Sequence, residues 1–241
     1  MELIQVKDYE EMSDKAAEMM AEKLNSLDAP VLGLATGSTP EGLYARLINM
    51  NKQKKISFQN ATTFNLDEYV GLAQDDPNSY HYYMWEKLFK HIDIPKENTH
   101  LPNGASDDLE QECRDYEQLI KEVGPIDIQL LGIGENGHIG FNEPGTSFTS
   151  RTAIVDLVES TIQANARFFD SMDDVPTRSI TMGIETIMEA KEILLLASGT
   201  KKADAIAQMV NGDVTESLPA SVLQKHDRVT VIADEAAMSK V

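Results

Sequence analysis

The sequence predicts an α/β fold, a three-layer sandwich in which helices cover both faces of a mainly parallel, Rossmann-like sheet. Short apolar runs recur along the 241 residues, and they are apolar continuously rather than at alternate positions, which is typical of strands buried on both faces. Helical patterns separate these runs, and strands that alternate with helices indicate βαβ units. The predicted strands are residues 30–36, 61–66, 126–133, 192–198 and 228–233.

Two of the connecting segments have apolar residues at the three- and four-residue spacing of an amphipathic helix. No internal repeat, low-complexity tract or long linker interrupts the pattern, so the sequence predicts one domain over residues 1–241. The two apolar faces are Ala16, Met20, Leu24 and Leu27 in the first helix, and Leu109, Cys113, Tyr116, Ile120 and Val123 in the second.

The composition excludes several kinds of partner. The chain has 40 acidic and 21 basic residues, a net charge of -19, and so lacks the basic surface that binds nucleic acid. A phosphorylated substrate would therefore need a local cluster of basic residues. No signal peptide and no apolar run of about 18 residues is visible, so we expect no membrane contact and a cytoplasmic location. Cys113 is the single cysteine, which fits a reducing compartment and a small core residue rather than a nucleophile.

The segment Leu130–Gly145 carries the strongest sign of chemistry. Its apolar strand stops at a glycine-rich turn, and Asn136, His138 and Glu143 follow within a few residues. A strand that ends in this way places polar side chains at the carboxyl edge of a sheet, where open α/β folds bind ligands. His138 can exchange protons near neutral pH and Glu143 can orient it, although a satisfied histidine in a surface loop is also consistent with this pattern.

The same segment matches the glycine pattern of dinucleotide-binding folds at Gly132, Gly134 and Gly137. That pattern requires a helix directly after the third glycine. Pro144 follows soon after, and the residues between lack a helical apolar stripe. The sequence therefore argues against a nucleotide cofactor.

The loop after the first predicted strand, residues 36–42, suits an anion. Thr39 is placed to cap the following helix, and Pro40 fits the first turn because its missing N–H would be unpaired there. An ordinary capped helix would explain these two residues but not Gly37 or the hydroxyl of Ser38. Free N–H groups, hydroxyls and the helix dipole together favour a phosphate.

The second predicted strand ends in two adjacent carboxylates, Asp67 and Glu68. Neighbouring side chains on a strand point to opposite sides, so at most one of them faces a given cleft. We expect Asp67 to face the cleft and Glu68 to point elsewhere. A solvated acidic turn is the alternative in a chain this acidic.

Three motifs occur in the order and spacing of a known family: TGSTP at 36–40, NLDEYVGL at 65–72 and GENGHIGFNEPG at 134–145. With residues 164–170 and 199–203 they closely resemble the glucosamine-6-phosphate deaminase (isomerase) family over nearly the whole chain. The 6-phosphogluconolactonases resemble the chain at the first loop and at the histidine segment, but they lack NLDEY and FNEP.

The resemblance implies conversion of glucosamine 6-phosphate and water to fructose 6-phosphate and ammonia, with no metal or organic cofactor. It makes Asp67 the base that moves a proton from C2 to C1. His138 would exchange protons with the ring oxygen and the C1 hydroxyl, and Glu143 would pair with His138. Many longer members have Asp where this chain has Asn136, so we expect only a positional role for Asn136.

For the substrate phosphate, the resemblance adds Arg167 and Lys202 to Gly37, Ser38 and Thr39. Arg gives forked recognition and Lys a point charge, which together supply the basic cluster that a phosphorylated substrate needs here. Two other functions stay open, lactone hydrolysis and sugar-phosphate sensing by part of a transcription regulator. The absence of a visible helix-turn-helix pattern disfavours the sensor.

Longer family members are hexamers activated by N-acetylglucosamine 6-phosphate, which basic residues shortly after FNEP help to bind. This chain has Ala153 and Val155 at the corresponding positions, and it ends at Val241 without the longer tail. Apolar residues cannot replace cations around a desolvated phosphate. We therefore expect hyperbolic kinetics and a monomer or small homo-oligomer.

Overall fold

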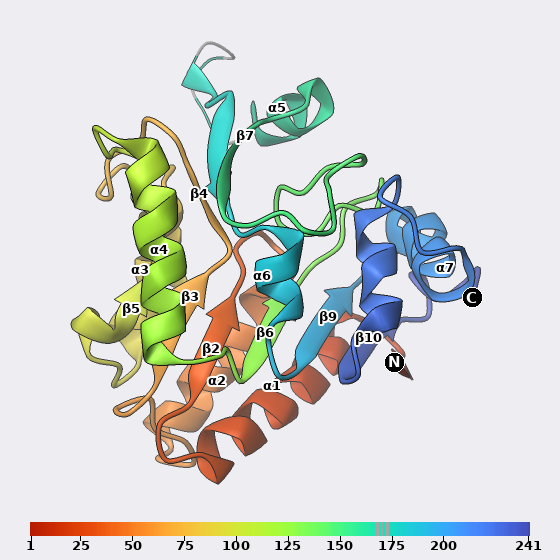
Figure 1. Ribbon diagram of the computed structural model, residues 1–241. Helices are drawn as coiled ribbons and strands as arrows, with labels where there is room; N and C mark the ends of the chain where they lie inside the picture. The colour runs from red at the N-terminus through yellow and green to blue at the C-terminus, as the bar shows by residue number, and fades with distance from the viewer. Residues whose placement is uncertain (167–168, 170, 172–173) are drawn as a thin grey trace.

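The computed structural model describes residues 1–166, 169, 171 and 174–241 (Figure 1). Its main sheet has seven parallel strands in the order β1-β10-β9-β6-β2-β3-β5. The strands are β1 (Glu2–Val6), β2 (Val31–Leu34), β3 (Thr62–Asn65), β5 (Thr99–His100), β6 (Ile128–Leu131), β9 (Ile193–Ala197) and β10 (Val229–Asp234).

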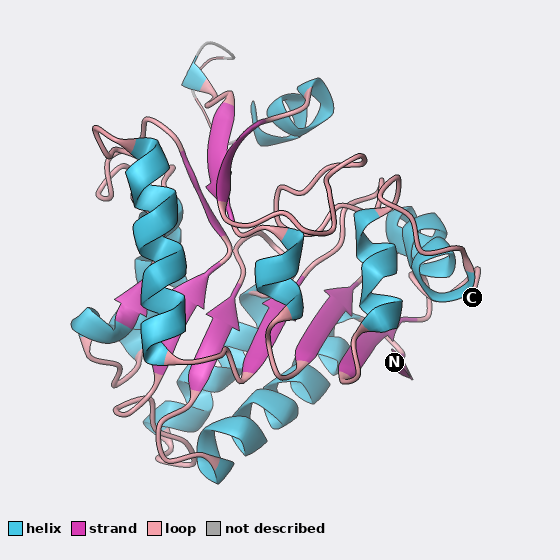
Figure 2. Ribbon diagram, viewed as in Figure 1, coloured by secondary structure: helices cyan, strands magenta, loops and turns pink. Residues whose placement is uncertain are grey.

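Helices lie on both faces of this sheet, with α1 and α2 on one side and α4 and α6 on the other (Figures 1 and 2). The predicted three-layer α/β architecture is therefore confirmed. The helices are α1 (Tyr9–Ser26), α2 (Glu41–Lys52), α3 (Tyr80–Lys87), α4 (Leu109–Val123), α5 (Glu159–Asn165), α6 (Ile184–Met188) and α7 (Ala203–Asn211). No helix in the described part of the chain is both long enough and apolar enough to cross a bilayer.

The two predicted apolar helix faces are confirmed except at one end of each. In α1 the buried face includes Met20 and Leu24, but Leu27 lies just past the last turn and is 37% exposed. In α4, Val123 at the last turn is 37% exposed as well, because the chain turns away from the sheet there. Cys113 is buried on the core side of α4, and burial raises the pKa of its thiol to about 11, so it is a core residue.

All five predicted strands are present, and the sequence missed two edge strands of the main sheet. β1 has mostly exposed side chains and β5 is only two residues long, so neither shows a continuous apolar run. The sequence also missed a second, antiparallel sheet in the order β4-β8-β7. It consists of β4 (Asp67–Tyr69), β7 (Ala153–Asp156) and β8 (Arg178–Thr181), and it stands over the carboxyl ends of the main sheet (Figure 1).

Leu66 joins the two sheets. Its N–H donates to the carbonyl of Leu34 at the end of β2 (3.2 Å), and its own carbonyl accepts from the N–H of Met182 after β8 (2.7 Å). Asp67 therefore starts the second sheet directly above the carboxyl edge of the first. This junction places a carboxylate where the loops of the main sheet converge.

Candidate active site

Three neighbouring strands of the main sheet, β2, β6 and β9, carry most of the candidate site in the loops that follow them. Along the chain, β2, β3 and β5 follow one another in one direction across the sheet, whereas β6, β9 and β10 follow in the opposite direction. β2 and β6 therefore lie at the point where the strand order reverses. Such a point opens a crevice at the carboxyl ends of parallel strands. Because these strands are parallel, the loops after β2, β6 and β9 lie together at the carboxyl edge of the sheet.

The loop after β6 is shaped around His138. The N–H of Gly134 donates to the carbonyl of His138 (2.9 Å), and a side chain on Gly134 would meet the imidazole ring at 2.3 Å. Gly137 has a φ of 82°, a conformation that favours glycine. Residues 132–152 contain no helix, so the helix that a dinucleotide-binding glycine pattern requires is missing from this segment.

Glu143 lies beside His138, as the sequence led us to expect. Nδ1 of His138 and Oε1 of Glu143 are 3.3 Å apart, an ion-pair distance, but without the alignment of a hydrogen bond. Asn136 Nδ2 donates to Glu143 Oε2 (2.7 Å), Asn136 Oδ1 accepts from the N–H of His138 (3.2 Å), and Thr161 of α5 donates to Glu143 Oε1 (3.2 Å). Burial raises the pKa of Glu143, but these neighbours outweigh it and hold the pKa below its ordinary value.

Asp67 is buried, and no hydrogen bond to its carboxylate is found among the described residues. It pairs through the backbone with Thr181 of β8, and Gly140 of the His138 loop packs against it, so that a side chain there would lie 3.6 Å from Oδ2. Burial first, and then the charge of Glu68, raise the pKa of Asp67 to about 8. A desolvated carboxylate of this kind is a stronger base than an ordinary aspartate.

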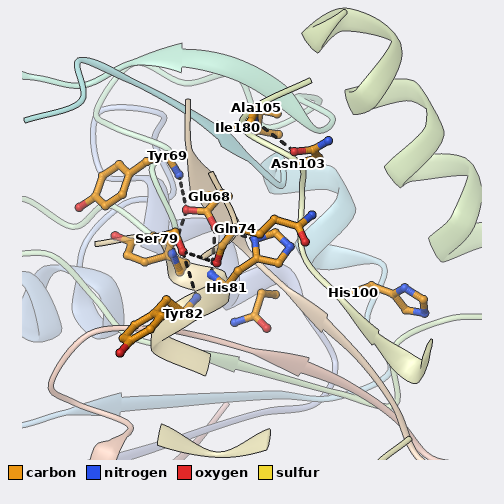
Figure 3. Close-up of polar contacts among 12 residues, drawn as sticks. Glu68, Tyr69, Gln74, Ser79, His81, Tyr82, His100, Asn103, Ala105 and Ile180 are labelled. Atoms are coloured by element: carbon orange, nitrogen blue, oxygen red, sulfur yellow. Dashed lines mark hydrogen bonds and ion pairs between the residues drawn. The ribbon is translucent and has the colours of Figure 1, made fainter. Parts of the chain in front are cut away.

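Glu68 points away from Asp67, as predicted, but it does not form a solvated turn. Its side chain is 1% exposed, and it accepts hydrogen bonds from the N–H groups of Tyr80 (2.9 Å) and His81 (3.0 Å) at the start of α3. Figure 3 shows these contacts together with the imidazole of His81. The sequence predicted the direction of this side chain but not its role.

The loop after β2 corrects one expectation. Thr39 does not cap α2, whose N-terminal boundary residue is Pro40 without a side-chain cap. Tyr9 of α1 takes over this role: its hydroxyl accepts from the N–H of Gly42 (2.8 Å) and contacts the carbonyl of Ser38 (2.9 Å). The hydroxyls of Ser38 and Thr39 accordingly make no hydrogen bond within the described residues.

A second tyrosine also holds the outer side of this loop. The hydroxyl of Tyr83 in α3 donates to the carbonyl of Gly37 (2.6 Å), and Gly37 has a φ of 94° with open space where a side chain would be. The sequence missed Tyr9 and Tyr83, because neither lies near the loop along the chain. Nothing local distinguishes them from other helical tyrosines.

Lys202 lies at the end of a short 3-10 turn, Thr200–Lys202, in the loop after β9. Asp234, at the end of β10, fixes this loop by accepting from the Ser198 hydroxyl (2.5 Å) and the Gly199 N–H (3.0 Å). Burial, more than any neighbouring charge, lowers the pKa of the Lys202 amine. Arg167, the other predicted phosphate ligand, lies outside the described residues.

Metal ligation finds no support in the described part of the chain, where no group of three or more His, Cys, Asp and Glu side chains is placed to hold an ion. Asn142, in the same loop as His138, is buried and bonds to the backbone. Its Nδ2 donates to the carbonyls of Ile139 and Met182 (both 2.9 Å) and so ties the His138 loop to the second sheet.

Residues 7–232 match the model of a protein family described as glucosamine-6-phosphate isomerases/6-phosphogluconolactonase. A glucosamine-6-phosphate deaminase of Oceanobacillus iheyensis is 59% identical over 100% of this chain and 96% of its own length. Glucosamine-6-phosphate deaminase 1 of Bacillus subtilis is 54% identical over 99% of both chains.

Two solved structures agree with this assignment at different levels. A monomeric glucosamine-6-phosphate deaminase superposes with a TM-score of 0.98 at 54% identity, and the match covers 100% of both chains. A 6-phosphogluconolactonase of Trypanosoma brucei, 19% identical over 100% of this chain and 98% of its own, reaches a TM-score of 0.80 and shows the shared fold alone. The chain therefore belongs to the glucosamine-6-phosphate isomerase/6-phosphogluconolactonase family.

Proposed function

We propose that this protein is a glucosamine-6-phosphate deaminase. It would open the sugar ring, move a proton from C2 to C1, and release the amine as ammonia with the uptake of one water to leave fructose 6-phosphate. The observation that carries the proposal is Asp67, a buried carboxylate with a raised pKa and without a hydrogen-bond donor among the described residues, next to the His138 loop. The resemblance to deaminases along the whole chain supports the same substrate.

Asp67 suits the proton transfer between carbons. Removal of the C2 proton by its carboxylate gives a planar enolamine, and the same carboxyl group returns the proton to C1 on the same face. The resulting imine at C2 adds water and loses ammonia. We expect Asp67→Asn to keep sugar-phosphate affinity and to lose turnover by roughly 10²–10⁴-fold, the usual contribution of general acid–base catalysis.

His138 suits the ring opening, in which a proton leaves the C1 hydroxyl and another reaches the ring oxygen. Glu143 would keep the imidazole oriented and basic, and Asn136 would keep Glu143 in place through its 2.7 Å hydrogen bond. An asparagine at this position supplies no charge, so Glu143 is the carboxylate that supports His138. Asn136 is thus a positioning residue in this proposal.

The loop at Gly37, Ser38 and Thr39 would bind the phosphate with Lys202. Two uncommitted hydroxyls at the start of α2 offer donors, and the helix dipole favours an anion there. The partly buried ammonium of Lys202 gives a local positive charge within a chain of net charge -19. By family resemblance Arg167 would join them.

Lactone hydrolysis is the main competing function, and it differs in how Asp67 would be used. A lactonase needs a base that activates water, which the His138–Glu143 pair could provide, but it has no carbon-bound proton for Asp67 to remove. A sugar-phosphate sensor would need neither. Release of ammonia from glucosamine 6-phosphate, with fructose 6-phosphate detected by a coupled assay, distinguishes the three. Hydrolysis of 6-phosphogluconolactone without ammonia release would overturn the proposal.

We further propose a cytoplasmic enzyme that is active as a monomer or small homo-oligomer without an effector. The substrate is a phosphate ester, which cells retain inside the membrane. Val155 and Ala153 lie on β7 with no basic side chain at either position. Saturation curves with and without N-acetylglucosamine 6-phosphate test the kinetics: we expect superimposable hyperbolas, and a sigmoidal curve that the effector makes hyperbolic would contradict this.

A further inference from the structure

Glu68 is a buried carboxylate that the proposed mechanism does not use. Its side chain is 1% exposed, and four donors surround it (Figure 3). Oε1 accepts from the N–H groups of Tyr69 (2.8 Å) and Tyr80 (2.9 Å), and Oε2 accepts from the N–H of His81 (3.0 Å) and contacts its Nδ1 (2.8 Å). Both carboxylate oxygens therefore act as hydrogen-bond acceptors, one towards β4 and α3 and the other towards His81.

These contacts join the strand that carries Asp67 to the start of a helix. Ser79 caps α3 by accepting from the N–H of Tyr82 (3.0 Å), while the first two helical N–H groups go to Glu68. Unpaired N–H groups and the positive end of the dipole both stabilise a negative charge there. β4 has only three residues, so a clamp on its second residue constrains the first.

We propose that Glu68 is a positioning residue for the reaction: its carboxylate fixes β4 to α3 and places a negative charge beside the base Asp67. The two side chains leave β4 on opposite faces, which lets Glu68 act on Asp67 without entering the substrate cleft. A like charge on the neighbouring residue makes it harder to ionise Asp67 and so makes Asp67 a stronger base. The proposal rests on the deaminase function and deepens it.

Other groups near Asp67 do not supply this charge. On β4 itself the only other titratable neighbour is Tyr69, and α3 and α4 contribute the phenols of Tyr80 and Tyr116. Burial raises the pKa of each phenol, so they are neutral at working pH. Thr181 on β8 is uncharged, and the loop after β6 brings the ion pair of His138 with Glu143. Glu68 is itself paired with His81, but among the described residues it is the carboxylate next to Asp67, and its charge adds to burial in raising the pKa of Asp67.

The test compares pH profiles of kcat/KM for ammonia release in wild type, Glu68→Gln and Glu68→Asp. The wild-type value should rise with pH, reach half of its maximum near pH 8, where Asp67 ionises, and level off above it. In Glu68→Gln we expect this rise to occur about one pH unit lower, because the neighbouring charge is gone. Glu68→Asp keeps the charge and should keep the wild-type profile, even if it is less stable. Glu86→Gln removes an exposed charge from the same helix and is the matched control.

An active Glu68→Gln enzyme with the wild-type profile would overturn the proposal. If Glu68→Gln does not fold, two variants of His81 test the proposal instead. We expect His81→Leu to lower kcat about tenfold with KM unchanged. His81→Asn keeps a donor to Glu68 and should have the wild-type kcat. A wild-type kcat in His81→Leu would count against the clamp. Failure of the deaminase function shows itself separately, as wild type that releases no ammonia, and it would remove this inference as well.

Discussion

Two histidine–carboxylate pairs lie in the described part of the protein, and they differ in what surrounds the carboxylate. Glu143 of the first pair receives side-chain donors from Asn136 and Thr161, and its contact with His138 is long, at 3.3 Å. Glu68 of the second pair receives backbone N–H groups, and its contact with His81 is 2.8 Å. The first pair sits in a glycine-rich loop at the sheet edge, and the second lies between a strand and a helix start.

This difference explains why the same residue types give different chemistry. Glu143 contacts the His138 ring at Nδ1, so Nε2 stays available for proton transfer to and from a substrate. Backbone donors fix the position of the Glu68 carboxylate, because the main chain of β4 and of the start of α3 holds both of its oxygens. We conclude that the first pair suits proton transfer and the second suits mechanical and electrostatic support.

The same substitution at the two histidines gives the largest expected contrast. His138→Asn should lower kcat by roughly 10²–10⁴-fold, because asparagine cannot transfer protons during ring opening. His81→Asn should stay within about threefold of wild type, because no proton transfer is lost there. Steady-state ammonia release measures both. Equal losses in the two variants would show that the pairs are not functionally distinct.

The two carboxylates should separate activity from stability. Glu143→Gln is expected to lower kcat/KM about 10²-fold with little change in thermal stability, since its neighbours are side chains that can rearrange. Glu68→Gln should lower the free energy of unfolding by about 1–3 kcal/mol, because an amide cannot accept from all the donors around it. Denaturation curves and kinetics on the same preparations check this. The reverse pattern would contradict our division of roles.

Smaller effects are expected at the proposed phosphate-binding loop, residues 37–39, where the affinity for the sugar phosphate is the quantity tested. Lys202→Ala should weaken fructose 6-phosphate binding by about 1.5–3 kcal/mol if its contact is charge-assisted. Tyr83→Phe removes only the hydroxyl that holds Gly37, and should weaken binding by about 1 kcal/mol without changing kcat. Tyr82→Phe, on the exposed side of the same helix, is the control. Unchanged affinity in both Lys202→Ala and Tyr83→Phe would place the phosphate elsewhere.

The last expected effect is a gain of stability, rather than a loss, in Asp67→Asn. The pKa of Asp67 is about 8 in the folded protein, well above the ordinary value of 3.8, so folding favours the protonated carboxyl. That contribution is complete below pH 3.8 and is lost as the pH rises through 8. The melting temperature of Asp67→Asn should therefore exceed that of wild type by an amount that grows from pH 5 to pH 8 and then levels off. Scanning calorimetry across this range would show a constant difference if Asp67 were solvated.

The sequence predicted the main sheet well because its central strands are buried on both faces. Such strands show continuous apolar runs, as in residues 126–133 and 192–198, and these patterns are local. The glycine-rich turn at Gly134 and Gly137 was equally visible, because a close approach to His138 and a positive φ both demand glycine. The candidate catalytic residues Asp67, His138 and Glu143 followed from motifs at the ends of these strands.

Only the tertiary structure decided what supports those residues. The second sheet pairs Asp67 with Thr181, and the Ser179 hydroxyl donates to the carbonyl of Glu68 (2.8 Å), contacts between segments more than a hundred residues apart that no local pattern encodes. Tyr9 replaces Thr39 at the start of α2 in the same way, from a different helix. Apolar periodicity is a local property of the sequence. A hydrogen-bond partner depends on which donors and acceptors the folded chain brings within reach, and only the tertiary structure determines this.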